Sequence, residues 1–275
     1  MADLRLLSGV LLRATLVSML TVCGFSAGAG VERDTSGASR VGSTSSEDSG
    51  DDAGWRPTVD LEFAFLSHYV WRGQLCTDGP VFQPAVSIAS HGLSLEVWAN
   101  QDLDDANDSE GEATEVDLTL LYEREFELLD VDWSLVGGVT GFLYPSSSDE
   151  ATVELIAGLA LEVPLRPTFH VYRDVAEIDG TYLNLGLEHG FDWRSLTLDL
   201  AASVGWGDRD YNSGYFDVEE SGFEDLLLSA SVSWEQEWLT LAPVVSYSQL
   251  LDSRLRDAAE DPYVWFGGLE ISISF

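Results

Sequence analysis

Residues 196–206 read LTLDLAASVGW, and their pattern is the clearest indication of the fold in this sequence. Every second residue from Leu196 to Trp206 is apolar, whereas Thr, Asp, Ala, Ser and Gly stand between them. Successive side chains of a β-strand point to opposite faces, so strict alternation predicts a strand with one apolar and one polar face. An amphipathic helix would instead repeat its apolar residues every three to four positions.

The same two-residue period recurs along most of the chain. Residues 226–234 alternate Leu, Leu, Ala, Val and Trp with mostly Ser, and the last strand alternates from Tyr263 to Phe275. Many segments have about the 9–11 residues that a tilted membrane strand needs. We predict about twelve strands, at 59–72, 81–90, 93–100, 114–124, 131–144, 151–162, 167–174, 181–191, 195–206, 225–235, 239–249 and 263–275.

The connections between these strands alternate in length. Tight turns occur at 90–92, 163–166, 192–194 and 236–238, whereas the intervening connections, such as 101–113 and 207–224, are mostly longer and acidic. Long loops at one end and short turns at the other are typical of outer-membrane barrels, whose short turns face the periplasm. The sequence therefore predicts a transmembrane antiparallel up-and-down β-barrel of about twelve strands.

Composition excludes several classes of protein. The 275 residues include 13 Arg, no Lys and 48 acidic residues, which gives a formal net charge of −35. Phosphate binding needs basic patches, so we expect no nucleic-acid partner. With 45% hydrophobic residues the chain is not simply a disordered acidic tail. In a barrel the acids can divide between hydrated loops and the aqueous inner face.

The N-terminal region has the composition of a targeting segment. Residues 1–29 resemble a secretory signal peptide with an apolar run at 14–25 and cleavage after Ala29. Residues 30–57 predict a flexible acidic linker rich in Ser and Gly. The barrel then occupies 58–275. These features together predict secretion to the bacterial outer membrane.

Aromatic residues gather near the predicted strand ends, as they do in the girdles of membrane barrels at the two lipid–water interfaces. The chain also ends on an alternating strand with a terminal Phe, which resembles the signal read by the barrel-assembly machinery. As girdle and assembly residues we predict Tyr69, Trp71, Trp206, Trp265 and Phe275.

The first strand and the loop after it resemble a known family. The run Ser67-His-Tyr-Val-Trp-Arg-Gly73, the run Asp78-Gly-Pro-Val-Phe-Gln83 and the run Gly92–Ala99 are similar to the N-terminal motifs of TorF-type porins. That family comprises bacterial outer-membrane barrels of poorly defined function. The resemblance covers about forty residues and implies an outer-membrane barrel and a pore, with no known substrate.

The candidate functional site is the barrel lumen, which we expect the polar faces of the strands to line. If lipid covers the apolar face, the other face lines the lumen, where water or Arg can solvate charge. Acidic rings favour cations, so we expect passive diffusion of small cationic or neutral solutes. The same acids could instead pair with Arg, Tyr and Ser and plug the barrel. The lumen and selectivity candidates are Glu62, Arg72, Glu96, Asp117, Glu154, Glu188, Asp199 and Glu270.

Other functions are possible. Arg72 either faces the lumen acids at a constriction or forms a strand-end salt bridge that fixes the first loop. A non-conducting barrel with a structural or surface role is one alternative, and a secreted acidic β-sandwich that binds cations or glycans is another. No Gly-x-Ser-x-Gly or His-Glu-x-x-His motif occurs, so we expect no catalysis, metal or cofactor. Expected partners are lipid, lipopolysaccharide, the barrel-assembly machinery and small solutes.

Overall fold

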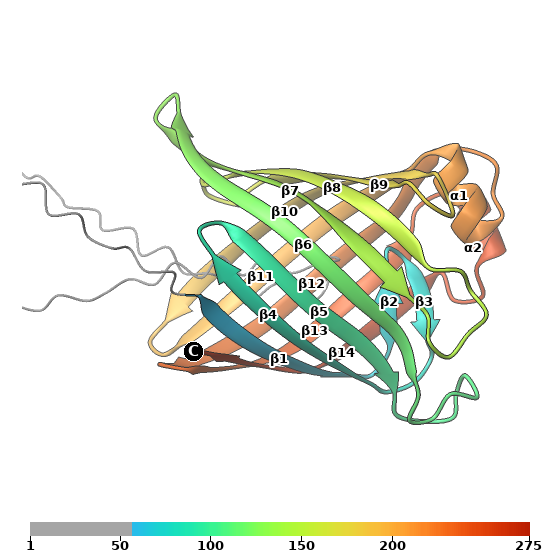
Figure 1. Cartoon of the computed structure of the whole chain (residues 1–275), viewed down its shortest axis with the longest axis horizontal. Helices are drawn as coiled ribbons and strands as arrows, with labels where there is room; N and C mark the ends of the chain where they lie inside the picture. The colour runs from blue at the N-terminus through green and yellow to red at the C-terminus, as the bar shows by residue number, and fades with distance from the viewer. Residues whose placement is uncertain (1–56) are drawn as a thin grey trace, which may run out of the picture.

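The computed structural model describes residues 57–275, so the predicted signal peptide and most of the linker lie outside the described residues. Twelve antiparallel strands form a closed barrel in which each strand pairs with its neighbours in the chain, and the last strand pairs with the first (Figure 1). The barrel strands are β1 (Thr58–Leu66), β4 (Val81–Ser90), β5 (Leu93–Asp102), β6 (Ala113–Leu128), β7 (Val131–Leu143), β8 (Thr152–Leu161), β9 (Thr168–Asp174), β10 (Thr181–Trp193), β11 (Leu196–Gly207), β12 (Gly222–Gln236), β13 (Leu239–Leu250) and β14 (Tyr263–Ser274).

The predicted fold class is confirmed, and the closed barrel excludes the β-sandwich alternative. The strand bounds differ from the predicted bounds by a few residues, with one larger exception. The first strand does not run across 59–72, because β1 ends at Leu66. The following residues form a separate two-stranded hairpin of β2 (Tyr69–Trp71) and β3 (Gln74–Thr77). Apolar and polar residues keep alternating through the hairpin, because the hairpin is also made of strands. The two-residue period therefore could not show where β1 ends and the hairpin begins.

The two ends of the barrel differ in the predicted way. One end, here called the turn end, carries both the start of β1 and the C-terminus together with short connections such as 91–92, 129–130 and 194–195 (Figure 1). The opposite loop end carries the β2–β3 hairpin and the helices α1 (Arg209–Phe216) and α2 (Ser253–Ala258). An even strand count brings both ends of the barrel sequence to the turn end.

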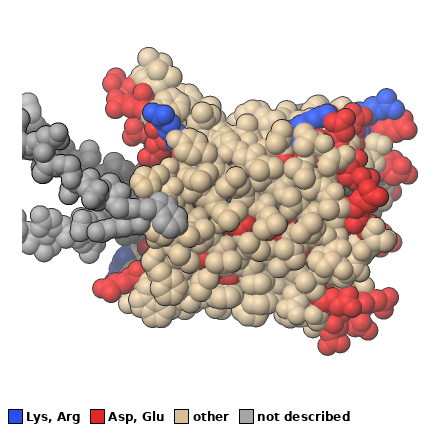
Figure 2. All heavy atoms as spheres, viewed as in Figure 1, with Lys and Arg blue, Asp and Glu red and all other residues tan. Residues whose placement is uncertain are grey.

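The outer face of the barrel is apolar. Leu120 on β6, Leu155 on β8 and Leu187 on β10 are each 43–49% exposed, although such side chains are normally buried in a water-soluble core. Figure 2 shows acidic side chains gathered at the two ends and a largely uncharged band between them. Within residues 57–275 no helix is long and apolar enough to cross a membrane.

The inner face of the barrel carries most of the polar side chains of the strands. Buried inward side chains include Asp60 on β1, Thr140 on β7 and Ser246 on β13. Apolar packing inside the barrel is concentrated toward the loop end, where one cluster of buried residues comprises Leu121, Val136, Ile156, Tyr172, Tyr182 and Tyr211. The interior therefore combines polar strand faces along its length with a packed group of aromatic and aliphatic side chains toward the loop end.

The predicted aromatic girdle is corrected at two positions. Trp265 is 68% exposed on the outer face, Trp206 has the same outward register, and Phe275 lies exposed at the turn end. The prediction for Tyr69 and Trp71 is wrong, because both belong to the hairpin and pack inside the barrel. These two aromatics therefore cannot contact lipid at the barrel surface.

A charge on the outer band tests whether this face contacts lipid. We expect Leu187→Arg to lower the free energy of unfolding in lipid by about 2–4 kcal/mol, because an Arg at mid-depth loses its hydration. The measurement is denaturant unfolding of the barrel refolded into vesicles. Leu129→Arg, in an exposed turn between β6 and β7, is the matched control and should change little. Equal effects of the two substitutions would contradict a lipid-facing band.

Candidate functional site

The centre of the site is an arginine that the hairpin carries into the barrel. Arg72 and Gly73 form the turn between β2 and β3, with φ values of 44° and 84°. A Cβ atom at Gly73 would lie 2.6 Å from Leu250 and 2.9 Å from Asp225, on strands of the barrel wall. Glycine is needed there both for the left-handed backbone and for this close approach. The turn thus packs directly against the wall.

Arg72 forms a buried bidentate ion pair with Glu154 on β8. Its Nη1 and Nη2 atoms donate to the two carboxylate oxygens of Glu154 at 2.8 and 2.7 Å. The Arg72 side chain is 3% exposed and that of Glu154 is 1% exposed. Two parallel hydrogen bonds between a guanidinium and a carboxylate are stronger than a single one, and they also fix the orientation of the two side chains. The pair ties the hairpin to the strand wall across the interior.

Aromatic rings surround the same guanidinium. Its Cζ atom lies 4.5 Å from the Trp71 ring centroid, 4.4 Å from that of Tyr172 and 4.5 Å from that of Tyr182. Nη1 also donates to the Tyr211 hydroxyl of α1 at 3.2 Å. Burial raises the pKa of Tyr211 well above its usual value, against the opposing effect of Arg72, so this phenol stays protonated. Aromatic rings from β9, β10, the hairpin and α1 therefore surround the guanidinium of Arg72.

Both strands of the hairpin have further anchors. The Tyr69 hydroxyl donates to Glu115 Oε2 on β6 at 2.9 Å. Thr77 on β3 donates to Asp102 Oδ1 on β5 at 2.9 Å, and Asp102 is itself fully buried. The hairpin is thus held by side chains, whereas its backbone pairs with no barrel strand.

A group of unpaired carboxylates lies on the inner wall nearer the turn end. Glu62 on β1 is separated from Glu96 on β5 only by β4, and Glu270 on β14 pairs with Ala64, the next inward residue after Glu62. The charge of Glu62 acts on both of the other two carboxylates. Within residues 57–275 none of the three forms an ion pair or accepts a side-chain hydrogen bond. This carboxylate cluster concentrates negative charge on one side of the lumen.

The other predicted lumen residues also face inward but belong to separate contacts. Glu188 pairs with Arg166, which also donates to Glu162 at 2.8 Å. Asp199 accepts a hydrogen bond from Ser233 at 3.2 Å, and Asp117 is buried with one carboxylate oxygen that has no protein partner. All eight candidates therefore lie inside the barrel, but they form several groups rather than one ring.

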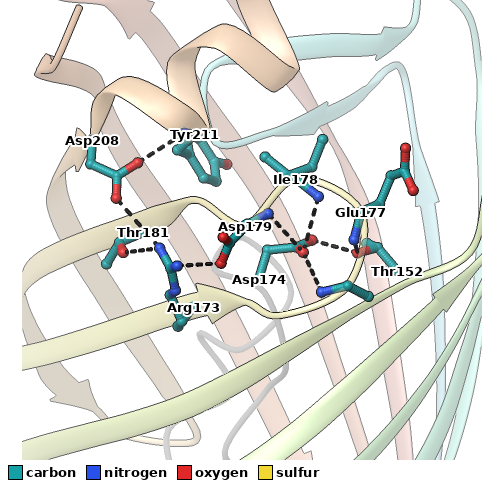
Figure 3. Close-up of polar contacts among 10 residues, drawn as sticks. Thr152, Arg173, Asp174, Glu177, Ile178, Asp179, Thr181, Asp208 and Tyr211 are labelled. Carbon is teal, nitrogen blue, oxygen red and sulfur yellow. Dashed lines mark hydrogen bonds and ion pairs between the residues drawn. The ribbon is translucent and has the colours of Figure 1, made fainter.

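The loop between β9 and β10 is organised by one buried carboxylate. Asp174 accepts hydrogen bonds from Thr152 Oγ1 at 2.5 Å and from the backbone N–H groups of Ala176 and Ile178 at 2.9 and 3.1 Å (Figure 3). Next to it, Arg173 reaches Thr181 and Asp208, the residue that caps the N-terminus of α1. These contacts position α1, and with it Tyr211, over the guanidinium.

Histidine, cysteine and carboxylate side chains form no larger cluster among the described residues. Across 57–275 no three His, Cys, Asp or Glu side chains converge to hold a metal ion. His68 Nε2 lies 3.3 Å from Asp78, and His68 Nδ1 lies 2.9 Å from Ser67 Oγ. The same local contact recurs between Ser90 and His91 in a turn, so it reflects the geometry of adjacent residues.

Some central residues were missed by the sequence analysis. Tyr172 and Tyr182 stand at inward positions of predicted strands, so strand alternation could have placed them inside. Tyr211 comes from a helix in a predicted loop, and no periodic pattern signals its position. Glu224 lay in the same predicted loop but belongs to β12.

Removing one partner of the buried pair should be costly. We expect Arg72→Met to lower the free energy of unfolding by about 3–5 kcal/mol, because Glu154 is left as an unpaired buried charge. Adding Glu154→Gln should recover part of that loss, since no lone charge then remains at this contact. Denaturant unfolding of the single and double variants measures the coupling. If the losses were simply additive, the pair would not be the interaction that holds the hairpin.

The known proteins that this chain resembles are distant. No curated protein matches the chain in sequence. Similar solved structures include the KdgM porin, at 10% identity, TM-score 0.47 and coverage of 79% of this chain and 99% of that one. The COG4313 outer membrane channel from Pseudomonas putida F1 has 9% identity, TM-score 0.48 and coverage of 84% and 100%. Outer membrane phospholipase A from Escherichia coli has 10% identity, TM-score 0.43 and coverage of 78% and 92%.

A family model covers more than half of the chain. Described as "Bacterial protein of unknown function (Gcw_chp)", it matches residues 51–242, which include the hairpin, Glu154 and the aromatic residues around Arg72. The chain therefore belongs to the Gcw_chp family.

Proposed function

We propose that this protein is a porin-like channel of the bacterial outer membrane that favours small cationic or neutral solutes. The observation that carries the proposal is the carboxylate cluster of Glu62, Glu96 and Glu270, which faces the interior without a cationic partner among residues 57–275. Acidic side chains that line a pore attract cations and repel anions. The resemblance of the first loop to TorF-type porins agrees with this function.

The outer surface and the loops support the location. An apolar band between two charged ends fits a bilayer, and an up-and-down barrel leaves no unpaired strand edge within it. In this orientation the turn end faces the periplasm and the acidic loops face outward. Lipid, lipopolysaccharide, the barrel-assembly machinery and the permeating solutes are the partners that this placement implies.

Barrel size is compatible with a narrow path. Eight strands enclose a space that side chains fill, whereas sixteen or more leave a wide aqueous channel. With twelve strands the lumen is intermediate, and here the β2–β3 hairpin occupies its loop end. We therefore propose that the described state is closed or nearly closed and that conduction requires the hairpin to move. A barrel in which the hairpin never moves would be the structural, non-conducting alternative.

Ion selectivity tests the proposed role of the carboxylate cluster. In planar bilayers under a salt gradient we expect cation preference, and Glu62→Gln combined with Glu96→Gln should reduce the cation-to-anion permeability ratio several-fold. Glu110→Gln, an exposed acid in the β5–β6 loop, is the control and should leave the ratio nearly unchanged. Anion preference in the wild-type protein would refute the proposal.

Conductance tests the role of the hairpin. We expect Arg72→Ala to increase the conductance or the open time, because the hairpin loses its contacts with Glu154 and the surrounding rings. Arg209→Ala, which removes an exposed arginine of α1, should not do so. If neither the wild-type protein nor Arg72→Ala conducts, the barrel is a structural element rather than a channel.

A further inference from the structure

A β-bulge near the loop end turns two consecutive acids into the barrel. The pairing of β11 with β12 shifts between Val204 and Trp206, so Gly205 faces both Glu224 and Asp225. Strict alternation would send one of these acids outward, yet Glu224 is 0% and Asp225 3% exposed. Bulges are a recurrent way of re-aiming side chains into a site.

The two acids differ in how their oxygen atoms are satisfied. Asp225 Oδ1 accepts a hydrogen bond from the Tyr182 hydroxyl at 2.7 Å. Neither Oε1 nor Oε2 of Glu224 has a hydrogen-bond partner in the protein. A buried carboxylate without partners is strongly unfavourable, so such a group in a native fold calls for a missing proton, water or ion.

A second unpartnered oxygen comes from α1. Asn212 is 1% exposed, and its Oδ1 atom also lacks a partner. Its Nδ2 atom donates to the Glu220 carbonyl at 2.7 Å, which fixes the orientation of the amide. A flipped amide would place two carbonyl oxygens against each other. The free oxygen therefore points away from Glu220.

Both sets of oxygens converge on Gly207. A Cβ atom at that residue would lie 2.1 Å from Asn212 Oδ1 and 2.8 Å from Glu224 Oε2. The absence of a side chain at Gly207 is therefore what lets the two oxygens, one from β12 and one from α1, lie against the backbone at this residue. Because both oxygens lie within 2.8 Å of this one point, they are near enough to each other to bind one ion at calcium–oxygen distances of about 2.3–2.6 Å.

Local charge favours a divalent ion. Glu224 interacts electrostatically with Asp225, Glu154 and Arg72, and all four side chains are buried. With all four groups ionised, the three carboxylates and one guanidinium carry a formal charge of −2, a state that burial opposes unless protons or a cation supply the balancing charge. A divalent cation balances that charge, and hard cations prefer carboxylate and amide oxygens.

We propose that a divalent cation of the Ca²⁺ class binds between Glu224 and Asn212 and fixes α1 to the barrel wall. The carboxylate supplies two oxygens and the amide one. The site was not expected from the sequence, because its ligands come from a bulge and from a helix in a predicted loop. It is independent of whether the barrel conducts, so failure of either proposal leaves the other standing.

Calcium-dependent stability tests this site in the full barrel refolded into detergent micelles. With Ca²⁺ as the probe, we expect the wild-type melting temperature to rise by several degrees, saturably, above its value in EDTA. Glu224→Gln should lose that saturable rise. Glu219→Gln, an exposed acid in the same loop, should keep it and controls for the many surface carboxylates.

Terbium luminescence gives a second readout that does not depend on stability. Tyr211 Cδ1 would lie 3.0 Å from a Cβ at Gly207, close enough for the ring to sensitise a bound Tb³⁺ ion. We expect a Ca²⁺-displaceable signal in the wild-type protein and in Glu219→Gln, and its loss in Glu224→Gln and Asn212→Ala. Equal Ca²⁺ and Tb³⁺ responses in the wild-type protein and Glu224→Gln would overturn the proposal, as would no Ca²⁺ response in the wild-type protein.

Discussion

The ion pair between Arg72 and Glu154 is the interaction on which the arrangement of the interior depends. It joins a hairpin with no backbone bond to the barrel to a strand that lies 82 residues further along the chain. A buried ion pair adds little folding free energy compared with apolar packing, but a buried charge without its partner is strongly destabilising. The pair therefore acts mainly by making the observed position of the hairpin much more stable than positions in which the two charges separate. The aromatic rings add attraction to the same cation and bring α1 into the contact.

The barrel also explains how so acidic a chain folds. Its strands separate an apolar outer face from an inner face that carries hydroxyls, amides and carboxylates, and many of the remaining acids lie at the two ends (Figure 2). Two arginines, Arg72 and Arg166, partner inward acids at the loop end and near the turn end respectively. Glu62, Glu96 and Glu270 are left without such partners among the described residues. The interior therefore combines a hairpin held at the loop end with a group of unpaired acids, and the proposed path for cations rests on these two features.

Strand alternation in the sequence was enough to predict the barrel and its twelve strands, and the inward direction of the seven lumen candidates that lie on those strands; Arg72 instead enters the interior on the hairpin. It was not enough for Tyr69 and Trp71, because a hairpin inside the barrel keeps the same two-residue period as a strand in the wall. Nor could it place Glu224, since a bulge breaks the alternation that such reasoning assumes. Contacts such as Arg72 with Glu154 join distant segments, and only the closed barrel brings them together. The local sequence pattern thus determines the strands of the barrel wall, whereas the position of the hairpin inside the barrel depends on contacts between distant segments.

The account depends on the hairpin being held inside the barrel. Hydrogen exchange of the backbone amides in residues 69–77 of the wild-type protein, refolded into lipid, measures this most directly, because exchange reports local opening. We predict that the segment exchanges far more slowly than the exposed loop at 103–112. Exchange as fast as in that loop, with the barrel strands still protected, would show that the hairpin is not held in the interior and would contradict the account.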